Sequence, residues 1–310
     1  MEDWKKRALE LRDAGYSSRR IGRAVGKGKS TINNFFKAHG LAPIKPVIPT
    51  AKILLLDVET APLLANVWGM FKQNVGLNQL EAHSYMLTWA AKWLGEDGVM
   101  AASLPDYPGY EVGSEDDKAL VSDLRDLMDH ADIIIAHNLR GFDKKVINTR
   151  ILINGIKPPK PYKTIDTLDI AKSQFKFTSN KLDGIAIQLG LQRKLATGGF
   201  ELWRGCMTGN PDSWNKMVDY NIQDVLVLEE VYLKLRAWDN RHPNVAIYGE
   251  NDRIRCTCCG SDKLTPTDGM AYTGVSAFAV WSCDDCGKYV RSRKNTLSKD
   301  KSANILANIV

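Results

Sequence analysis

Two runs of consecutive apolar residues, each followed at once by polar and acidic side chains, constrain the fold of this chain most strongly. Residues 53–58 read ILLLDV and residues 132–138 read DIIIAHN. A strand that is apolar on both faces is typical of the centre of a sheet whose two sides are covered by other elements. The chain is therefore expected to contain a buried sheet. It has no apolar run that approaches the roughly 18 residues of a membrane span.

The elements predicted around these runs alternate between strands and helices. Residues 85–94 and 99–104 flank a glycine-containing turn and are expected to form a hairpin. The sequence also predicts a strand over 162–168. A helix over 114–130 is expected with Ser114 as its N-cap, and a helix over 143–154 is expected to end at Gly155. Two further helices are expected, over 182–190 ended by Gly190 and over 211–238 with a break near Tyr220. Strands followed by alternating strands and helices indicate an α/β domain with a mixed sheet, which we place at residues 52–240.

Charge is distributed unevenly along the chain, although the total is +6. Residues 1–50 carry a net charge of +7, residues 51–250 carry −4 and residues 251–310 carry +3. Basic ends around an acidic middle indicate that the ends contact a polyanion, while the middle keeps its carboxylates for another purpose. The alternative is that the basic segments are solvated faces without a partner.

The N-terminal residues 1–41 show the pattern of three short helices. Apolar residues recur at helical spacing in the first, a serine caps the second, and Ser30 is the expected N-cap of the third. The segment resembles the helix-turn-helix domains of resolvases and related regulators, in which the third helix lies in the DNA major groove. The residues expected to meet phosphates or base edges are Lys29, Ser30, Thr31, Asn33 and Asn34.

The alternative for this segment is a three-helix module that docks on a protein. The net charge of +7 over residues 1–50 favours nucleic acid. Residues 42–51 follow and contain Pro43, Pro46 and Pro49. Spaced prolines favour an extended spacer, so we place a linker and a domain boundary there.

Paired carboxylates mark the end of the first buried run. Asp57 and Glu59 are two residues apart in a strand, so both side chains leave the same face. Two like charges this close repel, and burial increases the repulsion. Such a pair persists most readily beside a cation, and Mg²⁺ and Mn²⁺ prefer oxygen ligands. Asp143, which begins a helix just after the second buried run, supplies a third carboxylate.

A fourth carboxylate belongs to the long helix predicted near the end of the domain. Tyr220 and Asp224 are four residues apart and share one helical face, from which Asp219 and Asn221 are expected to point away. Each of these residues alone would suggest a cap, a turn or a solvated face. Their order along the chain and their places in the predicted elements form one pattern.

That pattern resembles the three exonuclease motifs of the DEDD superfamily in its tyrosine branch. The motifs are LDVET around Asp57, N-x3-FD from Asn138 to Asp143, and Y-x3-D from Tyr220 to Asp224. The chain is most similar, over residues 52–236, to predicted 3′–5′ exonucleases related to the proofreading domain of family-B DNA polymerases. The resemblance implies a ribonuclease-H-like fold with a mixed five-stranded sheet and flanking helices. Asp219 precedes the tyrosine, so the histidine branch is excluded.

The resemblance also implies a role for each residue. Asp57 would bridge two Mg²⁺ or Mn²⁺ ions, Glu59 and Asp224 would help to hold the first, and Asp143 would serve the second, mainly through water. Two such ions stabilise the entering and leaving oxygens of phosphodiester cleavage. Tyr220 would orient the nucleophile, since a phenol with an ordinary pKa of about 10 is a poor base at neutral pH.

Two cysteine pairs predict a separate metal site in the C-terminal part of the chain, at residues 251–295. The ligands expected are Cys256, Cys259, Cys283 and Cys286, arranged as two Cys-x2-Cys turns. This resembles a zinc ribbon, with one structural Zn²⁺ that leaves no position for water. Cys258 is a spare thiol that could replace Cys256.

The segment after the last cysteine is basic, and Arg291 and Arg293 are expected to contact nucleic acid. The alternative is that the ribbon is a folding staple without a binding role. The remaining residues 296–310 are expected to form a frayed tail.

Together these features predict a Mg²⁺/Mn²⁺-dependent 3′–5′ exonuclease that acts on DNA, alone or with a polymerase or replication protein in trans, in a phage or mobile element. The absence of an apolar leader in the first residues predicts a soluble protein of the cell or host cytoplasm, away from membranes. One alternative is a ribonuclease-H-like recombinase or junction-cutting endonuclease. Another is a DNA-binding regulator without catalysis, and a third is an exonuclease-like domain that has lost its chemistry.

Overall fold

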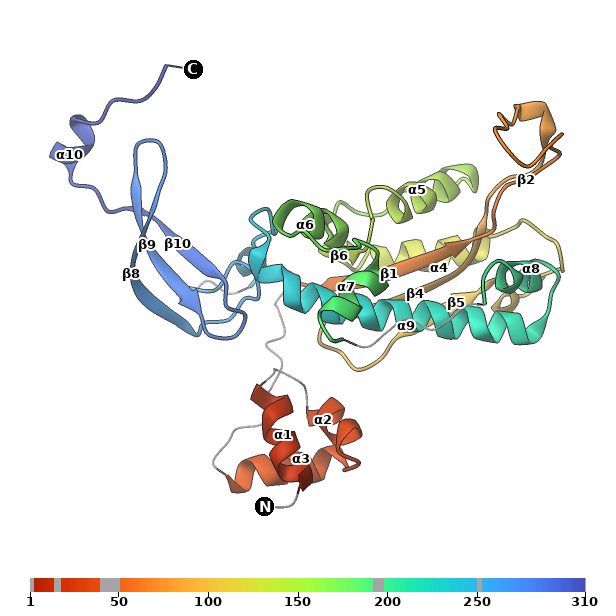
Figure 1. Ribbon diagram of the computed structural model, residues 1–310. Coiled ribbons are helices and arrows are strands. Elements are labelled where there is room, and N and C mark those ends of the chain that lie inside the picture. The colour runs from red at the N-terminus through yellow and green to blue at the C-terminus, as the bar shows by residue number, and fades with distance from the viewer. Residues whose placement is uncertain (1–2, 14–17, 40–50, 192–197, 250–252, 310) are drawn as a thin grey trace. The chain divides into compact units, whose positions relative to one another are not determined.

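The computed structural model describes residues 3–13, 18–39, 51–191, 198–249 and 253–309 (Figure 1). By its contacts the chain divides into two compact units, Met1–Ile48 and Pro49–Val310, each described here by itself. Most of the proline-containing linker expected at 42–51 lies outside the described residues. Within the described ranges, no helix combines the length and the apolar composition that crossing a bilayer requires.

The first unit contains three helices, as the sequence predicted. They are α1 (Asp3–Asp13), α2 (Ser18–Ala24) and α3 (Lys29–Ala38). Ala8, Ile21, Ile32 and Phe36 are fully buried and form their common core. The expected cap of the third helix was wrong, because α3 begins at Lys29 and Gly28 holds the N-cap position with no side-chain hydrogen bond.

A five-stranded mixed sheet organises the second unit, in the order β5-β4-β1-β6-β7. Its strands are β1 (Ile53–Thr60), β4 (Met86–Trp93), β5 (Met100–Ser103), β6 (Ile133–Ala136) and β7 (Lys163–Asp166). β1 runs antiparallel to β4 and parallel to β6. The predicted fold class of a mixed five-stranded sheet is thus confirmed, and the acidic strand β1 is at its centre.

Helices cover both faces of this sheet (Figure 1). They are α4 (Lys118–Met128), α5 (Asp143–Ile153), α6 (Thr167–Gln174), α7 (Leu182–Gln188), α8 (Glu201–Met207) and α9 (Pro211–Leu235). The sequence analysis did not foresee α6 or α8. The break expected near Tyr220 was wrong, because α9 runs continuously through it.

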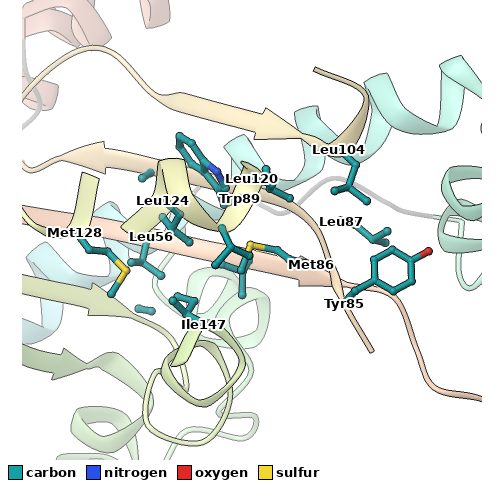
Figure 2. Packing of buried hydrophobic residues seen from close by; sticks show 14 of the residues in the cluster. Leu56, Tyr85, Met86, Leu87, Trp89, Leu104, Leu120, Leu124, Met128 and Ile147 are labelled. Carbon is teal, nitrogen blue, oxygen red and sulfur yellow. The ribbon is translucent and has the colours of Figure 1, made fainter. Parts of the chain in front are cut away.

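The side chains of β1 alternate between two hydrophobic cores. Leu54 and Leu56 belong to a core with residues of α4, α5 and α8, and Figure 2 shows Leu56 among Met86, Leu124 and Ile147. Ile53 and Leu55 belong to the other core, with residues of α6, α7 and α9. The odd-numbered positions of β1 therefore face the side on which most of α9 packs.

A buried ion pair fixes α5 to the sheet. Asp117 is fully buried and accepts hydrogen bonds from the amide of Met86 on β4 at 2.8 Å, from Nε of Arg150 at 2.6 Å and from Nδ2 of Asn154 at 2.7 Å. This cluster corrects the predicted start of α4, because the N-cap position belongs to Asp117 rather than Ser114. The carboxylate of Asp117 is used for tertiary contacts and makes no cap.

The C-terminal part of this unit is a separate three-stranded antiparallel sheet in the order β10-β9-β8. The strands are β8 (Leu264–Tyr272), β9 (Ala277–Cys283) and β10 (Tyr289–Asn295). The tail was expected to be frayed, but it contains the short helix α10 (Lys299–Ala303), whose N-cap Ser298 accepts a hydrogen bond from the amide of Lys301.

Removing Arg150 tests the importance of the buried pair. Arg150→Met leaves the carboxylate of Asp117 buried without its cation, which should lower the free energy of unfolding by about 3–5 kcal/mol. Lys145→Met, at an exposed position of the same helix, is the matched control and should change it by less than about 0.5 kcal/mol. Urea denaturation followed by circular dichroism measures both, and equal losses in the two variants would contradict the account.

Candidate metal sites

Three carboxylates converge where β1 meets α9. Asp57 and Glu59 continue the face of Ile53 and Leu55, and Asp224 approaches from α9, so that ligand oxygens of the three acids lie within 4.8 Å of one another. Asp224 is buried, whereas Asp57 and Glu59 are half-buried. Strand alternation explains why the first two acids share a face, and the packing of α9 on that face supplies the third.

Asp143 lies outside this group of three but is buried at the first position of α5. A carboxylate there is favoured by the positive end of the helix. The preceding loop is held by Asp166, which accepts hydrogen bonds from the amides of Asn138 and Arg140 at 2.9 and 3.0 Å. Asn138 has a φ of 71°, in the left-handed region that asparagine tolerates better than most residues.

Tyr220 borders the three acids. Burial is the main cause that raises the pKa of its hydroxyl above the ordinary value of 10, and the negative charges of Asp224 and Glu59 raise it further. The hydroxyl also shares a hydrogen bond with Asp224, one turn further along α9. The tyrosine ring makes an edge contact with Trp203 of α8, with the centroids 6.4 Å apart. Tyr220 therefore stays a neutral phenol that can donate a hydrogen bond.

Asn221 is the residue of this site that sequence reasoning missed. It was expected to point away, but it is fully buried and its Nδ2 donates to Oδ2 of Asp57 at 2.6 Å. Asn221 directly follows Tyr220 in α9, so helical geometry turns its side chain to a different face of the helix. Only the packing of α9 on β1 shows that this second face also contacts Asp57. The hydrogen bond orients the carboxylate of Asp57.

The four predicted cysteines converge in the C-terminal sheet. Cys256, Cys259, Cys283 and Cys286 offer sulfur atoms within 4.8 Å of one another. The Sγ atoms of Cys256 and Cys286 lie 3.6 Å apart, as do those of Cys259 and Cys283. Sulfurs bound tetrahedrally to zinc at about 2.3 Å are separated by about 3.8 Å, so this cage fits a zinc ion. The pKa of the Cys286 thiol is lowered by hydrogen bonds from neighbouring thiols. The largest of these effects comes from Cys256.

Cys258 is not among these four, and its Sγ donates to the backbone oxygen of Arg236 at 3.5 Å. The alternative in which it replaces Cys256 is therefore disfavoured by the geometry. Cys206 is a buried core residue of α8, and burial raises the pKa of its thiol to about 12.

The residues predicted to bind nucleic acid occupy two places that the structure leaves accessible. Ser30, Thr31 and Asn34 of α3 are exposed and Asn33 is half-buried, while the side chain of Lys29 lies outside the described part. In β10, Arg291 and Arg293 are exposed and two residues apart, so they share one face of the strand. The guanidinium of Arg291 lies over the ring of Phe278 at 4.1 Å. Contact of these residues with nucleic acid stays a prediction.

Comparison with known proteins finds similarity over part of the α/β domain. Residues 105–236 match the family model RNase_H_2, described as RNase_H superfamily. A family B DNA polymerase from the hyperthermophilic archaeon Pyrobaculum calidifontis is similar with 16% sequence identity and a TM-score of 0.44, over 60% of this chain and 25% of that one. No curated protein matches the chain. The matched residues and the five-stranded mixed sheet define a ribonuclease-H-like domain.

The donor chemistry of the acid site fits a hard divalent cation. Carboxylate oxygens are the ligands that Mg²⁺ and Mn²⁺ prefer, and three carboxylates converge here. The sulfur site fits a softer ion such as Zn²⁺. The two sites are therefore suited to different metals.

Asn221→Ala tests the positioning of Asp57. Loss of the Nδ2 donor should weaken Mn²⁺ binding about 10- to 100-fold, the usual effect of removing an outer partner of a metal ligand. Isothermal titration calorimetry measures the affinity, with Asn215→Ala at an exposed position of the same helix as the control. An unchanged affinity in Asn221→Ala would show that this hydrogen bond has no part in holding the ligand.

Single cysteine variants test the sulfur site. The purified chain should contain zinc, Cys259→Ser should lose it, and Cys258→Ser should keep it, because the Sγ of Cys258 lies outside the cage. Elemental analysis of the three proteins gives the content. Zinc lost from Cys258→Ser and kept in Cys259→Ser would overturn the assignment.

Proposed function

We propose that the chain is a metal-dependent 3′–5′ exonuclease that hydrolyses phosphodiester bonds of DNA. The observation that carries the proposal is the convergence of Asp57, Glu59 and Asp224 beside Tyr220 in a ribonuclease-H-like domain. That fold supports a nuclease-type function. The finer assignment to the tyrosine branch of the DEDD superfamily rests on the order and spacing of these residues in the sequence.

The residues that would hold the metals come from three elements. Asp57 would bridge two Mg²⁺ or Mn²⁺ ions, with Glu59 and Asp224 on the first. Asp143, buried at the start of α5 and outside the close group, would act on the second through water. When bound, such ions lower the pKa of the attacking water and offset charge on the leaving oxygen.

The remaining residues position groups and do not exchange protons. Tyr220 keeps its proton, since burial and neighbouring carboxylates raise its pKa, and its hydroxyl can orient the nucleophile or a phosphate oxygen. Asn221 donates to one oxygen of Asp57 and would thereby set the orientation of this carboxylate toward a metal ion. The Arg150–Asp117 pair anchors the last turn of α5, the helix that begins at Asp143.

The combination of modules suggests how substrate reaches the acids. In this proposal α1–α3 form a helix-turn-helix, and the sheet β8–β10 with its four cysteines forms a zinc ribbon. Both modules would bind DNA through the basic ends of the chain. Action with a polymerase or replication protein in trans, in a phage or mobile element, is the setting we propose. The recombinase or junction-cutting alternative is less favoured because its acidic set usually lacks a Tyr-x3-Asp helix, which is present here in α9.

A cleavage time course on 5′-labelled oligonucleotides tests the proposal. With Mn²⁺ the chain should produce a ladder that shortens from the 3′ end, and EDTA should abolish it. Asp57→Ala should reduce cleavage to background because the bridging carboxylate is lost. Tyr220→Phe should lower the rate by up to about 100-fold, since it removes only an orienting hydroxyl.

Each other outcome points to a different function. A single internal cut favours the recombinase or endonuclease, and uncut oligonucleotide retained in a gel-shift favours the regulator. Full activity in Asp57→Ala would remove Asp57 from the site. Circular dichroism of each variant shows whether a loss of cleavage activity is caused by misfolding.

A further inference from the structure

An exposed hairpin between β1 and β4 has no place in the account so far. It comprises residues 61–84 and contains the two short antiparallel strands β2 (Leu64–Ala65) and β3 (Leu80–Ala82). Figure 1 shows it projecting from the end of the five-stranded sheet. We call it the projecting hairpin. No motif or hydrophobic periodicity in the sequence predicts a structure or function for these residues.

The tip of the projecting hairpin exposes large apolar side chains. Trp68 is 97% exposed and Phe71 is 80% exposed. The other large apolar residues exposed in the same stretch are Leu63, Leu64, Val67, Met70, Val75 and Leu77. A soluble protein rarely exposes so many large apolar side chains in one short segment, and such exposure often marks an interaction site.

The base of the projecting hairpin is ordered by hydrogen bonds. The amide of Asn66 donates to the backbone oxygen of Gln79 at 2.9 Å, and Nε2 of Gln79 donates to the backbone oxygen of Asn66 at 2.8 Å. Gln79 also accepts from the amide of Gly76 at 2.8 Å. These hydrogen bonds close the loop that carries Trp68 and Phe71.

The projecting hairpin continues directly from the strand that carries the candidate catalytic acids. The amide of Ala61 donates to the backbone oxygen of Tyr85 at 2.9 Å, which extends the pairing of β1 with β4 beyond Glu59. Trp68 is nine positions after Glu59 along the chain, and these nine steps span at most about 30 Å. Trp68 therefore lies no farther than about 30 Å from Glu59.

The chemistry of the projecting hairpin suits nucleobases better than phosphates. Lys72 and Glu81 are the charged residues between Ala61 and Ala82, and their charges cancel. Trp68 and Phe71 offer flat aromatic faces, on which bases of any sequence stack. Exposed amide side chains that can bond to base edges accompany them, at Asn74 and Asn78.

We propose that the projecting hairpin binds unpaired bases of the strand being cleaved, with Trp68 and Phe71 as stacking platforms. This inference rests on the proposed nuclease function. Without bound metal the clustered acids repel phosphates, so a substrate gains from contacts that do not depend on charge. Stacking provides such contacts, and it favours single-stranded or frayed ends over paired DNA.

Binding without catalysis tests this proposal. Fluorescence anisotropy in EDTA compares a labelled oligothymidylate with an oligonucleotide of equal length made of abasic units, which keeps the phosphates and lacks the bases. The full chain should bind the oligothymidylate more tightly. The double variant Trp68→Ala/Phe71→Ala should lose about 30-fold or more of that affinity, while Trp68→Tyr/Phe71→Tyr should retain most of it.

Salt dependence separates stacking from phosphate contact. Because no counterions are released by stacking, the slope of log affinity against log salt should be the same in the alanine double variant and the unmodified chain. Leu152→Ala/Ile153→Ala, which removes two exposed apolar side chains from α5, is the matched control and should leave binding unchanged.

The outcome of this test is distinct from failure of the proposed function. Hydrolysis of the p-nitrophenyl ester of thymidine monophosphate, which has no second base to stack, should be equal in the unmodified chain and the alanine double variant and should be lost in Asp57→Ala. Equal oligothymidylate binding by the unmodified chain and the alanine double variant would overturn the stacking proposal and leave the hairpin as a surface for a protein partner.

Discussion

Mutual repulsion among Asp57, Glu59 and Asp224 is the constraint around which the α/β domain is built. Their ligand oxygens lie within 4.8 Å of one another. Two unit charges at such a distance repel by about 3 kcal/mol at an effective dielectric constant of about 20. β1 can carry two of the acids because β4 and β6 hold it on both edges, and α9 brings the third because its apolar residues are buried on the same face. Divalent cations are the natural balance for this charge.

Elements farther from the acids contribute rigidity. The Asp117–Arg150 pair ties α5 to β4, and Asp166 holds the loop that leads into α5, so Asp143 is fixed from both sides. A buried pair of this kind adds little net stability compared with apolar packing, but it specifies one arrangement. A metal ion held by the four cysteines would stabilise a small sheet whose apolar core is limited.

The parts that the sequence could predict depend on short-range pattern, and the rest depend on tertiary contact. Continuous apolar runs revealed β1 and β6, and the two-residue spacing of Asp57 and Glu59 placed them on one face. The role of Asn221 could not be found in this way, because its partner is 164 positions away in the chain. Ser114 is a reasonable cap by residue type, yet Asp117 takes the position because its carboxylate has partners on other elements. The projecting hairpin has no periodicity, and its exposure appears only in three dimensions.

Diffraction from crystals of the chain grown with Mn²⁺ tests the central claim most directly, because the anomalous signal locates the metal without reference to activity. The account predicts a peak in contact with Asp57, Glu59 and Asp224, and a second about 3.5–4 Å away on the side of Asp143. Density for Mn²⁺ elsewhere, with none beside Asp57, would contradict it.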